Sequence, residues 1–157
     1  MKKFINHVDH VAWITRAENL DRRVRELSEL CGVDLGEPSI RDDLGLTIYL
    51  SWEAGLEVVA PHAEVTPYNR LLHDRLERQG EGMWGVIFGV DRLEDARERA
   101  RGLGYTPSPI VTDPEDNPWS ARVTSVRESR ATEFLGTWLI YGEISYAEAV
   151  ITYETHH

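Results

Sequence analysis

The chain has 157 residues, of which 41% are hydrophobic and 28% charged, the usual composition of a globular domain. A formal net charge of −10 argues against nucleic acid and anionic membranes as partners. The single cysteine, Cys31, excludes an internal disulfide, and no apolar run approaches the length of a membrane span. We therefore expect a cytoplasmic protein with one domain over residues 1–157.

The first half of the chain predicts a β-α-β-β-β module, about residues 4–61. Polar and apolar residues alternate in its strands, whereas apolar residues in its helix recur at helical spacing until Gly32 ends it. The predicted elements are a strand, a helix and three further strands, over residues 4–15, 20–31, 38–41, 46–52 and 55–60.

The second half repeats this order after a linker, about residues 62–80, that carries a helix of its own. Asp91 and Glu94 form a D-x-x-E capping box, which predicts a helix that ends at Gly104. The linker helix and the strands of this half are predicted over residues 68–79, 82–90, 121–126 and 136–144. The second module therefore covers about residues 82–146, and the recurrence indicates an internal duplication.

Four short motifs occur in order along the two modules. They are VDHVA at 8–12, EVVAP at 57–61, GEGMWGVIFGVD at 80–91 and GTWLI at 136–140. With them the chain resembles the vicinal oxygen chelate superfamily of glyoxalases, bleomycin-resistance proteins and dioxygenases, and the third motif is similar to that of the methylmalonyl-CoA epimerase-like branch. The resemblance implies an α+β fold in which paired βαβββ modules form a curved, cup-shaped mixed sheet with helices on the outside.

The resemblance also implies a divalent cation held by four residues, two from each module. His10 and Glu57 match the first and second ligand positions. Gly85 and Ile140 stand at the third and fourth positions, and neither side chain can bind a metal. We therefore expect no cofactor, although His10 and Glu57 would be the ligands if a metal were bound.

The residues at and beside the third and fourth ligand positions predict an apolar surface in the second module. Gly85 and Ile87 share one face of their strand by alternation, as Trp138 and Ile140 do on the last strand. Gly89 and Gly142 continue these faces, so we expect open space for a small apolar or aromatic ligand.

Three arginines surround the approach to the last strand, and we assign one of them, Arg122, to ligand binding. Arg122, Arg127 and Arg130 can each clamp a carboxylate or phosphate of a ligand. The alternative is that they are scattered surface arginines without a function in binding.

Two classes of function remain open. One is an enzyme of the epimerase, isomerase or cyclase type, in which His10 and Glu57 act as an acid–base pair beside a carbonyl. The other is a bleomycin-resistance-like protein that binds a ligand without chemistry; a third interpretation is a metal-dependent lyase, isomerase or dioxygenase with a rebuilt ligand set.

Each of the two residues also has a structural alternative. His10 can be a core histidine bonded to a backbone carbonyl, and Glu57 can be a buried carboxylate paired with another side chain. We favour the enzyme, since sequestration alone needs neither side chain. A homodimer is expected, because symmetric pairs are the commonest assemblies.

Overall fold

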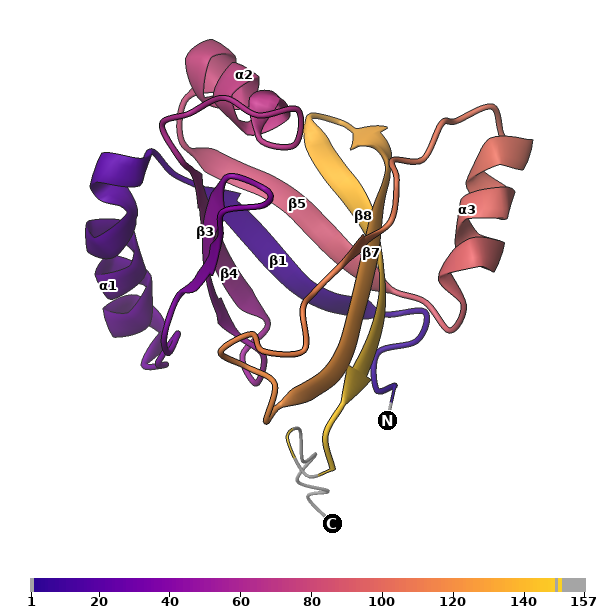
Figure 1. Ribbon diagram of the computed structural model, residues 1–157, viewed down its shortest axis with the longest axis horizontal. Coiled ribbons are helices and arrows are strands. Elements are labelled where there is room, and N and C mark those ends of the chain that lie inside the picture. The colour runs from indigo at the N-terminus through magenta and orange to yellow at the C-terminus, as the bar shows by residue number, and fades with distance from the viewer. Residues whose placement is uncertain (1, 149, 151–157) are drawn as a thin grey trace. The chain divides into compact units, whose positions relative to one another are not determined.

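The computed structural model describes residues 2–148 and 150 and contains two β-α-β-β-β modules within them (Figure 1). The first consists of β1 (Val8–Ile14), α1 (Leu20–Cys31), β2 (Ser39–Arg41), β3 (Leu46–Ser51) and β4 (Leu56–Pro61), with a 3-10 turn, η1 (Ala17–Asn19), before α1. The second consists of β5 (Gly82–Gly89), α3 (Leu93–Gly102), β6 (Val111–Thr112), β7 (Val123–Phe134) and β8 (Thr137–Tyr146), and α2 (Arg70–Gln79) lies between the modules in the chain.

Strand directions are mixed, as the duplicated architecture predicts. In the first module the hydrogen-bonded order is β2-β3-β4-β1, with β1 and β4 parallel and the other pairs antiparallel. In the second module the order is β5-β8-β7-β6. The predicted α+β class and the paired modules are therefore confirmed.

Contacts divide the chain into two compact units. The first unit contains residues 10–86 and 135–137, and the second contains the remaining described residues, 2–9, 87–134, 138–148 and 150. The linker helix α2 thus belongs to the same unit as the first module. No helix among the described residues is long and apolar enough to cross a membrane.

In the first unit, α1 covers one face of the strands (Figure 1). Leu20 of this helix packs with Val58 and Ala60 of β4, and Val24 and Leu27 extend the contact. These helical residues recur at the spacing of one helix face, so their burial against the strands stabilises α1. His10 and Glu57 lie on the opposite strand face from Val58, because successive side chains of a strand alternate.

In the second unit, the start of α3 differs from the predicted capping box. Neither Asp91 nor Glu94 caps the helix; the N-cap residue is Arg92, and it makes no side-chain cap. Instead Oε2 of Glu143, on β8, accepts a hydrogen bond of 2.8 Å from the Leu93 N–H. A carboxylate from a neighbouring strand satisfies a free N–H at the helix start as well as a local side chain does.

The predicted open space is absent at two glycines of the second unit. A Cβ on Gly142 would lie 2.8 Å from Cγ2 of Ile87. A Cβ on Gly89 would lie 2.0 Å from the backbone oxygen of Phe4. The prediction of open space is thus wrong at both positions, because the N-terminal segment and an isoleucine fill the volume that the missing side chains leave.

Replacing Gly89 by alanine should therefore destabilise the protein. The strand pairs here with the N-terminal segment, since the Asn6 N–H donates to Gly89 and the Gly89 N–H donates to His7, each at 2.8 Å. Gly89→Ala must displace this segment, and we expect a loss of about 2 kcal/mol in the free energy of unfolding. Urea denaturation measures it.

A matched control is available in α3. Nothing lies within 4 Å of a Cβ placed on Gly102. Gly102→Ala should therefore stabilise the protein by about 0.5 kcal/mol, because alanine restricts the unfolded chain and favours the helix. Equal effects of the two substitutions would contradict the close packing at Gly89.

Candidate functional site

His10 and Glu57 come together in the first unit. They lie on neighbouring parallel strands, β1 and β4, and the register pairs Ala12 with Glu57. His10 precedes Ala12 by two residues, so its side chain lies on the same face as that of Glu57. The Nε2 atom of His10 lies 3.0 Å from Oε2 of Glu57, a hydrogen-bond distance.

The two members of this pair differ in exposure. His10 is only 2% exposed, whereas the Glu57 side chain keeps 14% of its surface accessible. Trp52 packs edge-to-face on the imidazole, with ring centroids 5.3 Å apart at an angle of 73°. The imidazole is therefore held in one place from two sides, and Glu57 is the member that a ligand can reach. A proton can be held between the two side chains.

The residues at the four superfamily ligand positions do not fit a metal ion. His10 and Glu57 offer one nitrogen and carboxylate oxygens. Gly85 and Ile140 offer no side-chain donor, since one has no side chain and the other has an alkyl one. Within residues 2–148 and 150, no three His, Cys, Asp or Glu side chains gather as a metal-binding group.

The residues predicted for ligand binding are buried to different degrees. Gly85 and Ile87 are buried in β5, and Ile140 is buried in β8 with 8% exposure. Trp138 is partly buried, and Arg122 is exposed just before β7. Ile87 belongs to the packing against Gly142 described above.

Arg130 is the arginine that lies over the Trp138 ring. Its guanidinium carbon is 5.4 Å from the ring centroid, within the range of a cation–π contact. The sequence placed Arg130 among three candidates but contained no signal that distinguishes it from Arg122 or Arg127.

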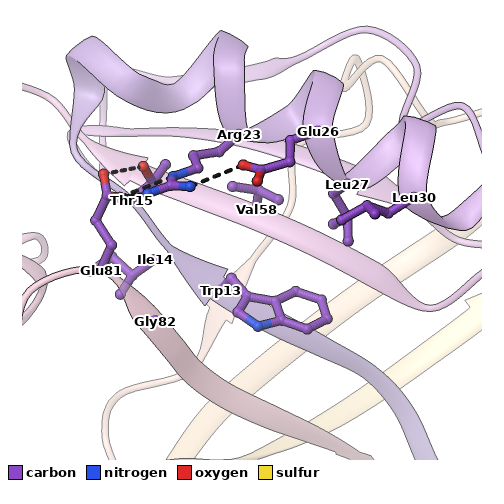
Figure 2. A pocket seen from close by; sticks show the side chains of 10 residues that line it. All are labelled: Trp13, Ile14, Thr15, Arg23, Glu26, Leu27, Leu30, Val58, Glu81 and Gly82. Atoms are coloured by element: carbon purple, nitrogen blue, oxygen red, sulfur yellow. Dashed lines mark hydrogen bonds and ion pairs between the residues drawn. The ribbon is translucent and has the colours of Figure 1, made fainter.

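A second feature, which the sequence did not reveal, is a pocket of about 250 Å³ beneath α1 in the first unit (Figure 2). Its lining is mainly apolar, and Trp13 of β1 lies on the opposite strand face from His10. The lining residues are Trp13, Ile14, Thr15, Arg23, Glu26, Leu27, Leu30, Val58, Glu81 and Gly82. This pocket is distinct from the histidine–glutamate pair.

Part of the lining of this pocket is a hydrogen-bond network around Glu81 (Figure 2). Its Oε1 accepts hydrogen bonds from the Thr15 hydroxyl at 2.7 Å and the Asn19 amide at 2.7 Å. The Arg16 N–H donates to the same oxygen at 3.1 Å, and Arg23 donates to Oε2 at 2.8 Å. Burial alone would raise the pKa of Glu81, but these hydrogen bonds outweigh it and lower the pKa to about 2. Glu81 is therefore ionised and joins the segment before β5 to the connection that follows β1, to η1 and to α1.

Comparisons with solved structures support the fold. They do not assign an activity. Methylmalonyl-CoA epimerase from Mycobacterium tuberculosis is 18% identical with a TM-score of 0.64, covering 91% of each chain. A methylmalonyl-CoA epimerase bound to methylmalonyl-CoA and NH4+ is 14% identical with a TM-score of 0.64, covering 93% of this chain and 97% of that one. The Streptomyces coelicolor epimerase with 2-nitronate-propionyl-CoA is 14% identical with a TM-score of 0.63, covering 90% and 98%.

No family model and no curated protein sequence matches the chain. The fold similarity extends over 91–93% of this chain, so it includes most of both modules. The chain therefore has the fold of the vicinal oxygen chelate superfamily, as its four sequence motifs predict.

Proposed function

We propose that this protein is an enzyme that acts on a small molecule. It removes a proton from the carbon next to a carbonyl group and returns it, without a divalent metal. The observation that supports this most is the His10–Glu57 contact of 3.0 Å, which joins a buried imidazole to a carboxylate that a ligand can reach. An acid–base pair in this arrangement performs proton transfer with no other cofactor.

The roles of the two residues follow from their exposure. The Glu57 carboxylate takes the proton from carbon, which leaves the substrate as an enolate, and the Glu57 carboxylic acid returns the proton. His10, behind it, donates its Nε2–H to the carboxylate and orients it, so that one oxygen points at the substrate. A single base returns the proton to the face it came from. Return to the same carbon gives only exchange with solvent, return to another atom of the enolate on that face gives an isomerisation, and an epimerisation requires a second acid on the other face.

Metal independence is part of this proposal and is supported by the donor set. Only two donor side chains occupy the four ligand positions, and glycine and isoleucine at the other two cannot complete the coordination. The competing interpretation is a metal-dependent enzyme in which other groups complete the set.

The second candidate function is ligand binding without chemistry. It is favoured by the deep burial of His10 and its edge-to-face contact with Trp52, which also suit a purely structural pair. Under this alternative the His10–Glu57 contact stabilises the strands and takes no proton from a ligand.

Proton exchange in deuterated water tests these candidates. Because the neighbouring epimerases bind methylmalonyl-CoA and 2-nitronate-propionyl-CoA, the panel contains 2-substituted acyl thioesters together with aryl and alkyl ketones. The protein is incubated with each compound in excess EDTA, and NMR follows the loss of the signal of the proton next to the carbonyl. We expect exchange with the wild-type protein and none with the double variant His10→Gln/Glu57→Gln.

The alternatives give different results in the same assay. A compound that binds tightly but keeps its proton assigns the binding function. Exchange that EDTA abolishes and that zinc, nickel or manganese restores assigns the metal-dependent reaction and contradicts our proposal.

A further inference from the structure

Arg130 and Trp138 form a fixed pair on neighbouring strands of the second unit. Arg130 lies on β7 and Trp138 on β8, and both side chains are partly buried. The guanidinium carbon lies 5.4 Å from the centroid of the indole ring. The indole therefore covers one side of the guanidinium, and the N–H groups at the guanidinium edge remain for other partners.

The backbone beneath this pair is held by Ser108. The Arg130 N–H donates to the Ser108 hydroxyl at 2.8 Å, and the Ser108 N–H donates to the Arg130 carbonyl at 2.9 Å. The hydroxyl of Ser129, the preceding residue of β7, donates to the Ser108 carbonyl at 2.7 Å. The Arg130 side chain thus starts from a rigid position, which lowers the entropy that it loses when it binds a ligand.

Arg130 differs from neighbouring arginines in how its positive charge is paired. Arg127 contacts the carboxylates of Glu94 and Glu143, and Arg97 donates to the Ser108 carbonyl. Among the residues that the structure describes, no carboxylate or carbonyl is placed to accept a hydrogen bond from the Arg130 guanidinium. Burial lowers the pKa of Arg130, and no negative charge offsets that effect. A partly desolvated cation in this state favours an anion from outside the chain.

We propose that Arg130, stacked on Trp138, binds the carboxylate of a small organic acid. The guanidinium presents two parallel N–H groups that match the two oxygens of a planar carboxylate. One arginine balances one negative charge, which favours a monoanion over a phosphate dianion. The partly exposed indole offers apolar surface to the body of the acid. This binding does not depend on proton transfer at His10 and Glu57, so it can be tested whether or not the protein is an enzyme.

Benzoate is a suitable probe because it joins a carboxylate to a flat apolar ring. The five tryptophan indole N–H signals of the 15N-labelled 157-residue protein are followed during the titration, and Trp138→Phe identifies the signal of Trp138. We expect benzoate to shift that signal in a saturable way, benzamide to leave it unchanged, and Arg130→Gln to weaken the binding at least tenfold.

Matched variants separate the proposed role from a structural one. Arg101→Gln removes an exposed arginine that pairs with Glu98 in the preceding helical turn, and it should leave benzoate binding unchanged. Arg130→Lys keeps the charge but loses the two parallel donors, so it should bind benzoate several-fold more weakly than the wild type; this comparison serves if Arg130→Gln does not fold.

Three results would overturn the proposal. The first is no shift of the Trp138 signal with benzoate at millimolar concentration. The second is a shift that persists at full strength in Arg130→Gln and in Arg130→Lys. The third is saturable binding of inorganic phosphate at this signal in the absence of benzoate binding, which would assign a phosphate site instead.

Discussion

Glu57→Gln should lower the rate of proton exchange by about 10²–10⁴-fold, the usual contribution of a general base. The amide has nearly the same shape as the carboxylate and can still accept a hydrogen bond from His10, so the fold should remain. Because the amide cannot take a proton, the loss should appear in kcat, with KM almost unchanged. Steady-state exchange rates followed by NMR in deuterated water measure both quantities.

His10→Gln should cause a smaller loss than Glu57→Gln, because His10 positions the carboxylate and does not itself reach the substrate. Glu64→Gln is the matched control: it makes the same carboxylate-to-amide change at an exposed loop residue of the first unit and should leave kcat at the wild-type value. Equal rates for the wild type and Glu57→Gln would disprove the role of Glu57 as the base. A larger loss for His10→Gln than for Glu57→Gln would exchange the two roles.

Glu81→Gln should lower the free energy of unfolding by about 2 kcal/mol at neutral pH. The pKa of Glu81 is lowered from 4.5 to about 2. At about 1.36 kcal/mol for each pKa unit, this difference limits the stabilisation by the ionised form to about 3 kcal/mol. The partial exposure of the side chain, 19%, reduces that value. Urea denaturation of the two proteins at pH 7 measures the difference.

The effect of Glu81 should also depend on pH in a definite direction. A carboxylate with a lowered pKa contributes its full stabilisation above the unfolded-state pKa of about 4.5, and this contribution disappears as the pH falls toward 2. The difference in stability between the wild type and Glu81→Gln should therefore shrink as the pH is lowered from 5 to about 2.

Glu26→Gln is the control for this series. Glu26 contacts the same Arg23 at 2.9 Å but is 51% exposed, so its loss should cost about 0.5 kcal/mol or less. A difference between the wild type and Glu81→Gln that stays constant from pH 7 to pH 3 would contradict the ionic origin of the stabilisation.

Much of the site at His10 and Glu57 was predictable because it depends on short-range patterns. Alternation along a strand decides which side chains share a face, and the register of two neighbouring strands then brings Glu57 beside His10. The superfamily resemblance placed the two residues at one site. Neither pattern contained the difference in exposure that assigns separate roles to the two residues.

The capping of α3 and the glycine positions show where local patterns fail. The D-x-x-E box before α3 is a valid local signal, but Glu143, fifty residues later in the chain than Leu93, takes its place. Gly89 suggested open space, whereas the backbone of Phe4 occupies it. In both cases a segment distant in sequence supplies the atoms, and composition and period contain no information about it.

The sequence by itself determined the order of the elements, the duplication and the residue types at the four ligand positions. The first two follow from hydrophobic period and helix-ending glycines, which act over a few residues, whereas the four ligand positions are those that the superfamily resemblance implies. Only the tertiary structure decided that Glu81 is held by three preceding segments and that Arg130, rather than another arginine, covers Trp138. Such contacts join side chains from separate segments, so they exist only after the strands and helices have packed.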